Sequence, residues 1–143
     1  MKKAILTLVV LSLACFVQAQ QVNESKVPVK IKDAFNSKNP EASLFRWEKQ
    51  KNNYKAVYKG TDNAETTALY SPSGKLIERE FKLSSEEWST IIVEYLSNVE
   101  PKQTLNMISV VMDADGHKSY KAQIHGMYYF FDSNESFVRK INQ

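Results

Sequence analysis

Tyr54-Lys55-Ala56-Val57-Tyr58 is the stretch of sequence that decides the fold, because its opening recurs later in the chain as Tyr120-Lys121-Ala122. Side chains that alternate with a period of two are typical of a β-strand that buries one of its faces. A second echo joins residues 35–40 to residues 96–101, since each begins with an apolar residue and ends with Pro. The sequence therefore predicts one structural unit that occurs twice.

Two helices are predicted, each ahead of a group of four strands. The second, over residues 85–97, has Ser84 as its N-cap and Glu87 three residues later, which is the pattern of a capping box. Its apolar stripe follows the spacing of one helix face and consists of Trp88, Ile91, Ile92, Tyr95 and Leu96. The first helix is expected over residues 28–37, where Pro28 suits the first turn.

The segments after each helix have the pattern of strands. The predicted strands span residues 44–49, 54–59, 65–70 and 75–81 after the first helix, and residues 105–112, 119–125, 127–131 and 137–141 after the second. Short connections such as residues 51–53 require antiparallel pairing, because a parallel crossover needs about a dozen residues. The predicted fold class is therefore α+β, with two tandem α-β4 repeats over residues 20–81 and 82–143.

The two repeats are predicted to differ in length. The match of residues 35–40 to residues 96–101 has an offset of 61 residues, as does the match of Tyr70 and Leu76, on either side of a turn, to Phe131 and Phe137. The Tyr-Lys-Ala match has an offset of 66. The second repeat thus carries about five extra residues, which we place in its first hairpin around residues 113–116.

A secretory signal peptide is predicted over residues 1–19. Met1-Lys2-Lys3 supplies a positive start, residues 4–16 are an uncharged apolar run, and Val17-Gln18-Ala19 has the small-x-small pattern of a cleavage site. The run is shorter than the roughly 20 apolar residues of a membrane-spanning helix. We therefore expect export and no membrane span.

Lipidation at Cys15 is the alternative to cleavage after Ala19. Ala14-Cys15 resembles the end of a lipoprotein signal, but Ser12 stands where such signals prefer Leu. Cleavage after Ala19 is favoured for that reason. The two outcomes differ physically, because an acyl chain would anchor the protein to a membrane.

Cleavage after Ala19 would leave 124 residues, enough for one domain with its own core. It would also remove Lys2, Lys3 and Cys15, which lowers the formal net charge from +3 to +1 and leaves no cysteine for a disulfide. A nearly neutral chain gives no indication of nucleic acid or anionic lipid as a partner. We expect a periplasmic or secreted protein that is held together by packing alone.

The chain resembles a known family in the order and spacing of its structural motifs. These motifs are Val27-Pro28-x-x-Ile31-x-x-Ala34-Phe35, Pro40, Phe45-Arg46-Trp47-Glu48, Tyr54-Lys55-Ala56-Val57-Tyr58 and Ser73-Gly74-Lys75-Leu76. They are similar to those of PepSY-like, β-lactamase-inhibitor-like (BLIP-like) proteins that Gram-negative bacteria export. The second repeat departs from the pattern, since Glu135 stands where the turn glycine belongs and no Pro opens its helix.

The resemblance implies that the strands of both repeats join into one antiparallel sheet with the helices packed on one face. It also implies a periplasmic location and a role in binding or inhibiting another protein through the opposite, open face of the sheet. The shared motifs are structural, and no inhibitory contact residue of the family can be carried over to this chain.

Alternation along the strands selects candidate binding residues on the open face. If Tyr54, Ala56 and Tyr58 face the helices, their neighbours point the other way. The candidates are Lys55, Val57, Leu69, Lys121, Gln123, Tyr128 and Phe130. Four of them are expected to form an exposed apolar strip, of the kind that marks interaction surfaces, and these are Val57, Leu69, Tyr128 and Phe130. The alternative is the ordinary strand propensity of such residues on a solvated sheet, or cover by a loop.

The sequence contains no convincing catalytic or metal-binding motif. Asp113-Ala114-Asp115-Gly116 is interpreted as a hairpin turn, because a calcium loop in this register would need carboxylates in place of Val111 and Ala122. His117 and His125 each adjoin a predicted turn and lack the spacing of zinc ligands. Neither a Gly-x-Ser-x-Gly elbow nor a phosphate-binding glycine loop occurs. We expect no metal, no cofactor and no enzymatic activity.

Two functional hypotheses follow. The first is an exported periplasmic binding module, inhibitor-like in character, that engages a protein or peptide of the cell envelope through the open face. The second is a structural or small-ligand-binding envelope protein, which could form a homodimer through the same face.

Overall fold

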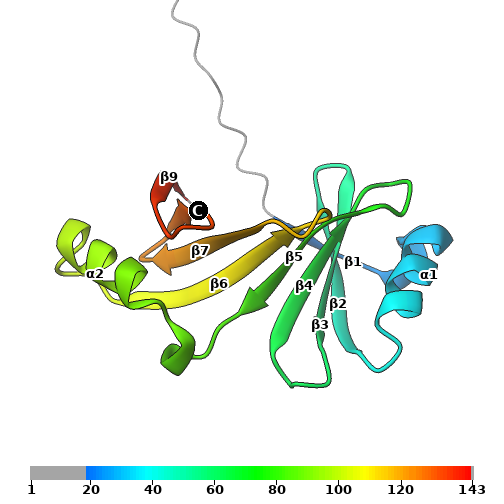
Figure 1. Ribbon diagram of the computed structural model, residues 1–143. Helices are drawn as coiled ribbons and strands as arrows, with labels where there is room; N and C mark the ends of the chain where they lie inside the picture. The colour runs from blue at the N-terminus through cyan, green and yellow to red at the C-terminus, as the bar shows by residue number, and fades with distance from the viewer. Residues whose placement is uncertain (1–18, 143) are drawn as a thin grey trace, which may run out of the picture.

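One antiparallel sheet of nine strands runs through the described chain, residues 19–142 (Figure 1). In the computed structural model the elements follow in the order β1 (Gln20–Val22), η1 (Glu24–Lys26), α1 (Val29–Lys38), β2 (Ser43–Gln50), β3 (Asn53–Lys59), β4 (Glu65–Tyr70), β5 (Leu76–Lys82), η2 (Ser85–Glu87), α2 (Thr90–Val99), β6 (Leu105–Asp113), β7 (Lys118–Ile124), β8 (Met127–Phe131) and β9 (Phe137–Asn142). The predicted signal peptide, with Cys15, lies outside the described residues except for Ala19. Between residues 19 and 142, the helices are too short or too polar to cross a membrane.

The strands pair in chain order from β1 to β9, and each pair is antiparallel. Tight turns join most neighbours, whereas α1 lies between β1 and β2 and α2 lies between β5 and β6. β5 and β6 pair from Glu78↔Asp113 to Lys82↔Ser109, so both halves of the chain belong to the same sheet. The α+β class and the single antiparallel sheet are therefore confirmed.

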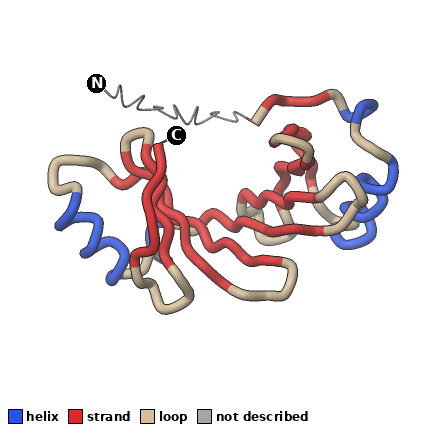
Figure 2. The backbone as a smooth tube through the Cα atoms, turned by 90° about the horizontal axis from the view of Figure 1, so that it is seen from above, coloured by secondary structure: helices blue, strands red, loops and turns tan. Residues whose placement is uncertain are grey.

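Both helices pack on the same face of this sheet, which we call the helix face. Directly paired residues lie on one side of a sheet, so the register carries a face from strand to strand. The α1 cluster consists of Val27, Ile31, Phe35, Trp47, Ala56, Tyr58, Ala68 and Tyr70. The α2 cluster consists of Ile92, Leu96, Ile108, Ala122, Ile124, Tyr129 and Phe131. The helices lie at opposite ends of the molecule, and neither covers β5 in the middle (Figures 1 and 2).

The two core clusters use residues at matching positions of the two halves. Ile31 and Ile92 are both fully buried, and they are separated by the 61 residues that relate the helix ends. Ala56 and Ala122 are also fully buried and are separated by 66 residues. This correspondence is compatible with two tandem repeats, which themselves remain a prediction.

The second helix begins later than its sequence pattern predicts. Ser84 and Glu87 do interact, since the Ser84 amide and hydroxyl both donate to Glu87 Oε2 at 2.9 Å, but they enclose only the short η2 turn. Trp88 and Ser89 are extended, and α2 starts at Thr90 with Ser89 as its N-cap. The prediction of one helix from residue 85 is wrong because two capping serines compete over five residues, and the second one starts the α-helix.

All eight predicted strands are present, with ends within about one residue of those expected. The ninth, β1, was not predicted; it pairs Gln20, Gln21 and Val22 with the outer edge of β2. Three residues without apolar alternation carry too little pattern to be distinguished from a loop. The first helix lies where it was expected, with Pro28 directly before it as N-cap.

The β4–β5 turn is fitted closely against α1. Gly74 has a φ of +86°, and a Cβ at this position would lie 3.1 Å from the backbone oxygen of Lys30. Gly116, in the β6–β7 turn, has a nearly identical φ of +87° but no atom within 4 Å of such a Cβ. The two glycines therefore share one backbone requirement and differ in their contact with a helix.

We expect Gly74→Ala to destabilise the protein by about 2 kcal/mol and Gly116→Ala by about 1 kcal/mol. Both substitutions force an L-residue into the left-handed region, but only the first also pushes against α1. Urea unfolding of the two variants measures the difference. Equal losses of free energy of unfolding in the two variants would show that the β4–β5 turn accommodates the added Cβ without pushing against α1.

Candidate binding surface on the open sheet face

The register places all seven candidate residues on the open face, opposite the helix face. Lys55 pairs with Leu69 and Val57 pairs with Thr67 on the first half of the sheet. On the second half, Lys121 pairs with Phe130 and Gln123 pairs with Tyr128. Each of these pairs is one residue out of phase with positions that pack under a helix, such as Ala56 and Ala122. The faces predicted from side-chain alternation are therefore the faces these residues occupy.

The expected exposed apolar strip is wrong for its first half. Val57 is 2% exposed and Leu69 is 8% exposed, although no helix lies on their face. Val57 pairs with Arg46 on β2, and Leu69 pairs with Lys55 and with Glu78. Long charged side chains at adjacent positions cover short apolar ones with their aliphatic stems, and strand twist brings them closer.

The second half of the strip is half-buried, and a cation lies over each of its rings. Lys121 Nζ is 5.1 Å from the centre of the Tyr128 ring, and the Arg139 guanidinium is 4.7 Å from the centre of the Phe130 ring. Such contacts are favourable and partly shield the ring from water. The surface is therefore a patch of alternating rings and cations, which we call the ring–cation patch: Lys121, Tyr128, Phe130 and Arg139.

An ion pair connects this patch to the centre of the sheet. Lys121 Nζ donates to Glu80 Oε2 at 2.5 Å, and the two side chains are only 19% and 16% exposed. Lys121 lies on β7 and Glu80 on β5, so the pair spans β6, the strand that carries the fully buried Ser109. Short, poorly solvated ion pairs of this kind hold their side chains in one place.

Glu78 is the second carboxylate at the centre of the open face. Burial is the main cause that raises the pKa of Glu78 above its ordinary value of 4.5; Glu80 raises it further, whereas Lys121 and Lys55 oppose the shift. Because Lys121 is already paired with Glu80, the charge on Glu78 is only partly compensated. The middle of the open face therefore holds two carboxylates: Glu80, which is paired with Lys121, and Glu78, which is partly buried and only partly compensated.

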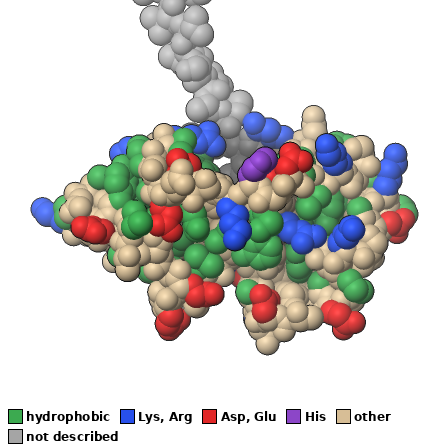
Figure 3. Space-filling view, viewed as in Figure 1, with side chains coloured by type: hydrophobic (Ala, Val, Ile, Leu, Met, Phe, Trp, Pro, Cys, Tyr) green, Lys and Arg blue, Asp and Glu red, His purple; other side chains and the backbone are tan. Residues whose placement is uncertain are grey.

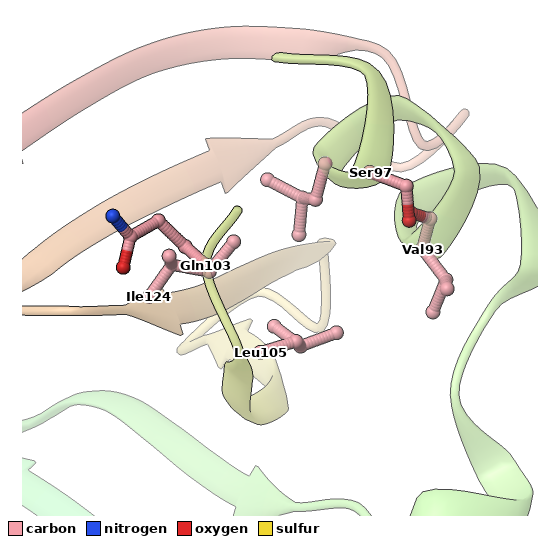
Figure 4. A pocket seen from close by; sticks show the side chains of 6 residues that line it. Val93, Ser97, Gln103, Leu105 and Ile124 are labelled. Atoms are coloured by element: carbon pink, nitrogen blue, oxygen red, sulfur yellow. The ribbon is translucent and has the colours of Figure 1, made fainter. Parts of the chain in front are cut away.

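Two surface depressions between residues 19 and 142 lie away from the candidate residues. A recess of about 40 Å³ beneath α2 is lined by Val93, Leu96, Ser97, Gln103, Leu105 and Ile124 (Figure 4). This recess is far smaller than a typical small-molecule site. A wider notch of about 460 Å³ separates the η2 turn from the β3–β4 hairpin at the lower edge of Figure 3, with Asp62, Glu65 and Glu87 on its walls.

The β6–β7 turn brings together three side chains that sequence reasoning treated separately. One ligand-type atom from each of Asp113, Asp115 and His117 lies within 4.8 Å of the other two. Asp113 Oδ1 accepts from the backbone amides of Asp115 and His117 at 2.9 Å, and Asp113 Oδ2 is 3.0 Å from His117 Nδ1. These bonds build the turn itself, in agreement with its interpretation as a hairpin. His125 lies in the next turn, with a φ of +41°.

Comparison with known proteins identifies the architecture and leaves the family open. No protein-family model matches the chain, and no curated protein matches it either. Among solved structures, a protein of Bacteroides eggerthii described as periplasmic superposes with a TM-score of 0.68 at 15% identity, over 81% of this chain and 88% of that one. A DUF2874 family protein of Bacteroides uniformis gives 0.68 at 11% identity, over 80% and 88%.

A BLIP-like protein of Bacteroides fragilis also superposes, with a TM-score of 0.60 at 13% identity, over 80% of this chain and 85% of that one. At such identities the likeness concerns the fold alone. The BLIP-like fold implied by the sequence resemblance is therefore supported, whereas the PepSY-like assignment stays a prediction.

We expect Lys121→Met to lower the free energy of unfolding by about 2 kcal/mol, because it leaves the Glu80 carboxylate poorly solvated and unpaired. Glu80→Gln in the Lys121→Met background should recover part of this loss. A double-mutant cycle by urea unfolding measures the coupling. Lys82→Met is the control, since Lys82 is exposed on the same face; an equal loss there would contradict a specific ion pair.

The variant Glu78→Gln tests the raised pKa of the Glu78 carboxyl through the pH dependence of the free energy of unfolding. The folded protein keeps a proton on Glu78 at pH values where the unfolded chain has lost it, so this group makes stability fall as pH rises above about 4.5. The variant has no titrating group at this position. Its free energy of unfolding should therefore rise relative to that of the wild type between about pH 4 and pH 7. A difference in free energy of unfolding that stays constant with pH would contradict the shift.

Proposed function

We propose that this chain is an exported, non-enzymatic protein-binding module of the periplasm, and that it engages its partner through the open face in the manner of an inhibitor. The ring–cation patch carries the proposal. Tyr128 and Phe130 are held in place by β7 and β9, and each presents a ring together with a cation. Aromatic and arginine side chains of this kind supply most of the affinity in protein interfaces.

An exposed apolar residue on β9 also lies beside the ring–cation patch. Ile141 on β9 is 43% exposed and pairs with Tyr128, so it extends the patch towards the free edge of the sheet. An edge strand also offers unpaired backbone groups to a partner. The ring–cation patch and Ile141 therefore bring aromatic, cationic and apolar side chains together beside this edge.

The similar solved structures support a periplasmic protein with a BLIP-like fold. The similar structures include proteins described as periplasmic and one described as BLIP-like, and the first 19 residues have the pattern of a signal peptide. Inhibition is the finer part of the proposal, and it comes from the BLIP-like resemblance. A homodimer through the same face is the competing outcome.

The double variant Tyr128→Ala, Phe130→Ala should remain folded and lose its partner. The test is cross-linking of the mature protein in envelope extract, followed by recovery of the cross-linked species. We expect the wild type to capture a partner and the double variant to capture about tenfold less or none, since the loss of two anchor residues costs several kcal/mol of binding. Circular dichroism and urea unfolding establish that the variant is folded.

Ile91→Ala is the matched control, because Ile91 is 58% exposed on α2, away from the open face. This variant should capture as the wild type does. Undiminished capture by the double variant would contradict the proposed surface. Sedimentation at high concentration identifies the competing dimer, because self-association through the patch would raise the mass of the wild type and not that of the double variant.

A further inference from the structure

The middle of the helix face is a second surface, which lies between the two helices and is only partly covered. α1 packs over β2, β3 and β4, and α2 packs over β6, β7 and β8, at opposite ends of the sheet (Figures 1 and 2). β5 lies between the two clusters, and none of its seven residues is fully buried. Its residues on this face are Leu76, Arg79 and Phe81.

Arg79 is unusual among the three arginines of the chain. Arg46 pairs with Glu48 at 2.7 Å, and Arg139 lies over the Phe130 ring. Arg79 has neither a carboxylate nor a ring partner among the described residues, and its Nε is buried without a hydrogen bond. The Nε–H group has lost solvation that no hydrogen bond replaces, so an oxyanion that contacts this guanidinium would be favourable.

The charges of the helix face point to the same ligand. The strand residues that the register places on this face include four cations and no carboxylate, and the cations are Lys49, Arg79, Lys118 and Lys140. The open face, in contrast, carries both signs, including Glu78 and Glu80. Lys49 and Lys140 lie over aromatic rings at the two ends, which leaves Arg79 and Lys118 in the centre.

Arg79 and Lys118 lie in one row across the sheet. Arg79 pairs with Met112, and Met112 pairs with Lys118, so the two cations are separated by two strand spacings, roughly 10 Å between backbones. Both cations therefore lie on the same face of the sheet, on either side of Met112. Tyr58 and Tyr70 border Arg79 on the other side; burial raises the pKa of both phenols, and the Arg79 charge partly opposes that shift.

We propose that Arg79 and Lys118 form an anion-binding site for a carboxylate or phosphate group in the middle of the helix face, between the two helices. Arg79 provides the planar fork that matches such a group, and Lys118 provides a second charge on the solvent side. The site lies on the opposite face from the ring–cation patch, so it does not depend on the proposed function.

Nuclear magnetic resonance of the mature protein tests the site directly, because the three arginine Nε–H signals report on three different surroundings. Inorganic phosphate and succinate are titrated separately, with sodium chloride at equal ionic strength as the reference. We expect a saturable shift of the Arg79 Nε–H signal at concentrations on the order of millimolar. The signals of Arg46 and Arg139 should not follow the same curve.

Substitutions identify the residues that hold the anion. Arg79→Lys keeps the charge but loses the fork, and it should weaken binding about tenfold. Lys118→Gln should weaken it about threefold, and this exposed residue can be replaced without risk to the fold. Lys49→Gln, on the same face but at its end, is the matched control and should bind as the wild type does.

The source of the anion is distinguished by a hexaglutamate peptide in a third titration. Tighter binding of the peptide than of succinate assigns the site to an acidic protein segment, and tighter binding of phosphate assigns it to a phosphate-bearing ligand. A shift that fails to saturate, or that chloride reproduces, overturns the proposal. Unchanged affinity in both Arg79→Lys and Lys118→Gln overturns it as well.

Discussion

The pairing of β5 with β6 is the contact on which the rest of the structure depends. Its five residue pairs run from Glu78↔Asp113 to Lys82↔Ser109, and the backbone bonds Ala114 N–Ile77 O and Leu83 N–Ile108 O extend it at both ends. Each half has a helix and a core of its own. This ladder determines which residues of the second half share a face with those of the first half. A slip of one residue in its register would put α2 on the opposite face of the sheet from α1.

A consequence of this common register is that the two faces of one sheet have different electrostatic character. The open face combines carboxylates and cations, so its charges largely neutralise one another, as Lys121 and Glu80 do at 2.5 Å. The helix face between α1 and α2 carries cations alone in its strands, and Arg79 there has no partner among the described residues. Paired charges hold side chains in a fixed arrangement, whereas unpaired charges attract ligands of the opposite sign.

The sequence predicts the elements and faces of this fold well because alternation is a local property. Val57 and Leu69 were assigned to the correct face but are buried, and the residues paired with them on neighbouring strands, Arg46, Lys55 and Glu78, are absent from a pattern along one strand. The start of α2 was misplaced for a related reason, since two capping serines are locally equivalent. Likewise, the cations over Tyr128 and Phe130 come from other strands, and only the three-dimensional register brings them there.

These cations also decide how a partner could reach the open face. A group that stacks on Tyr128 must compete with Lys121, which Glu80 holds at 2.5 Å on the far side of β6. Phe130 is covered by Arg139, an exposed residue of the edge strand with no carboxylate partner among residues 19–142. Moving Arg139 aside breaks one ring contact, whereas moving Lys121 also breaks an ion pair with low solvent exposure. Phe130 is therefore the ring that a partner can uncover at the lower free-energy cost, and the released guanidinium would remain available for an acidic group beside it.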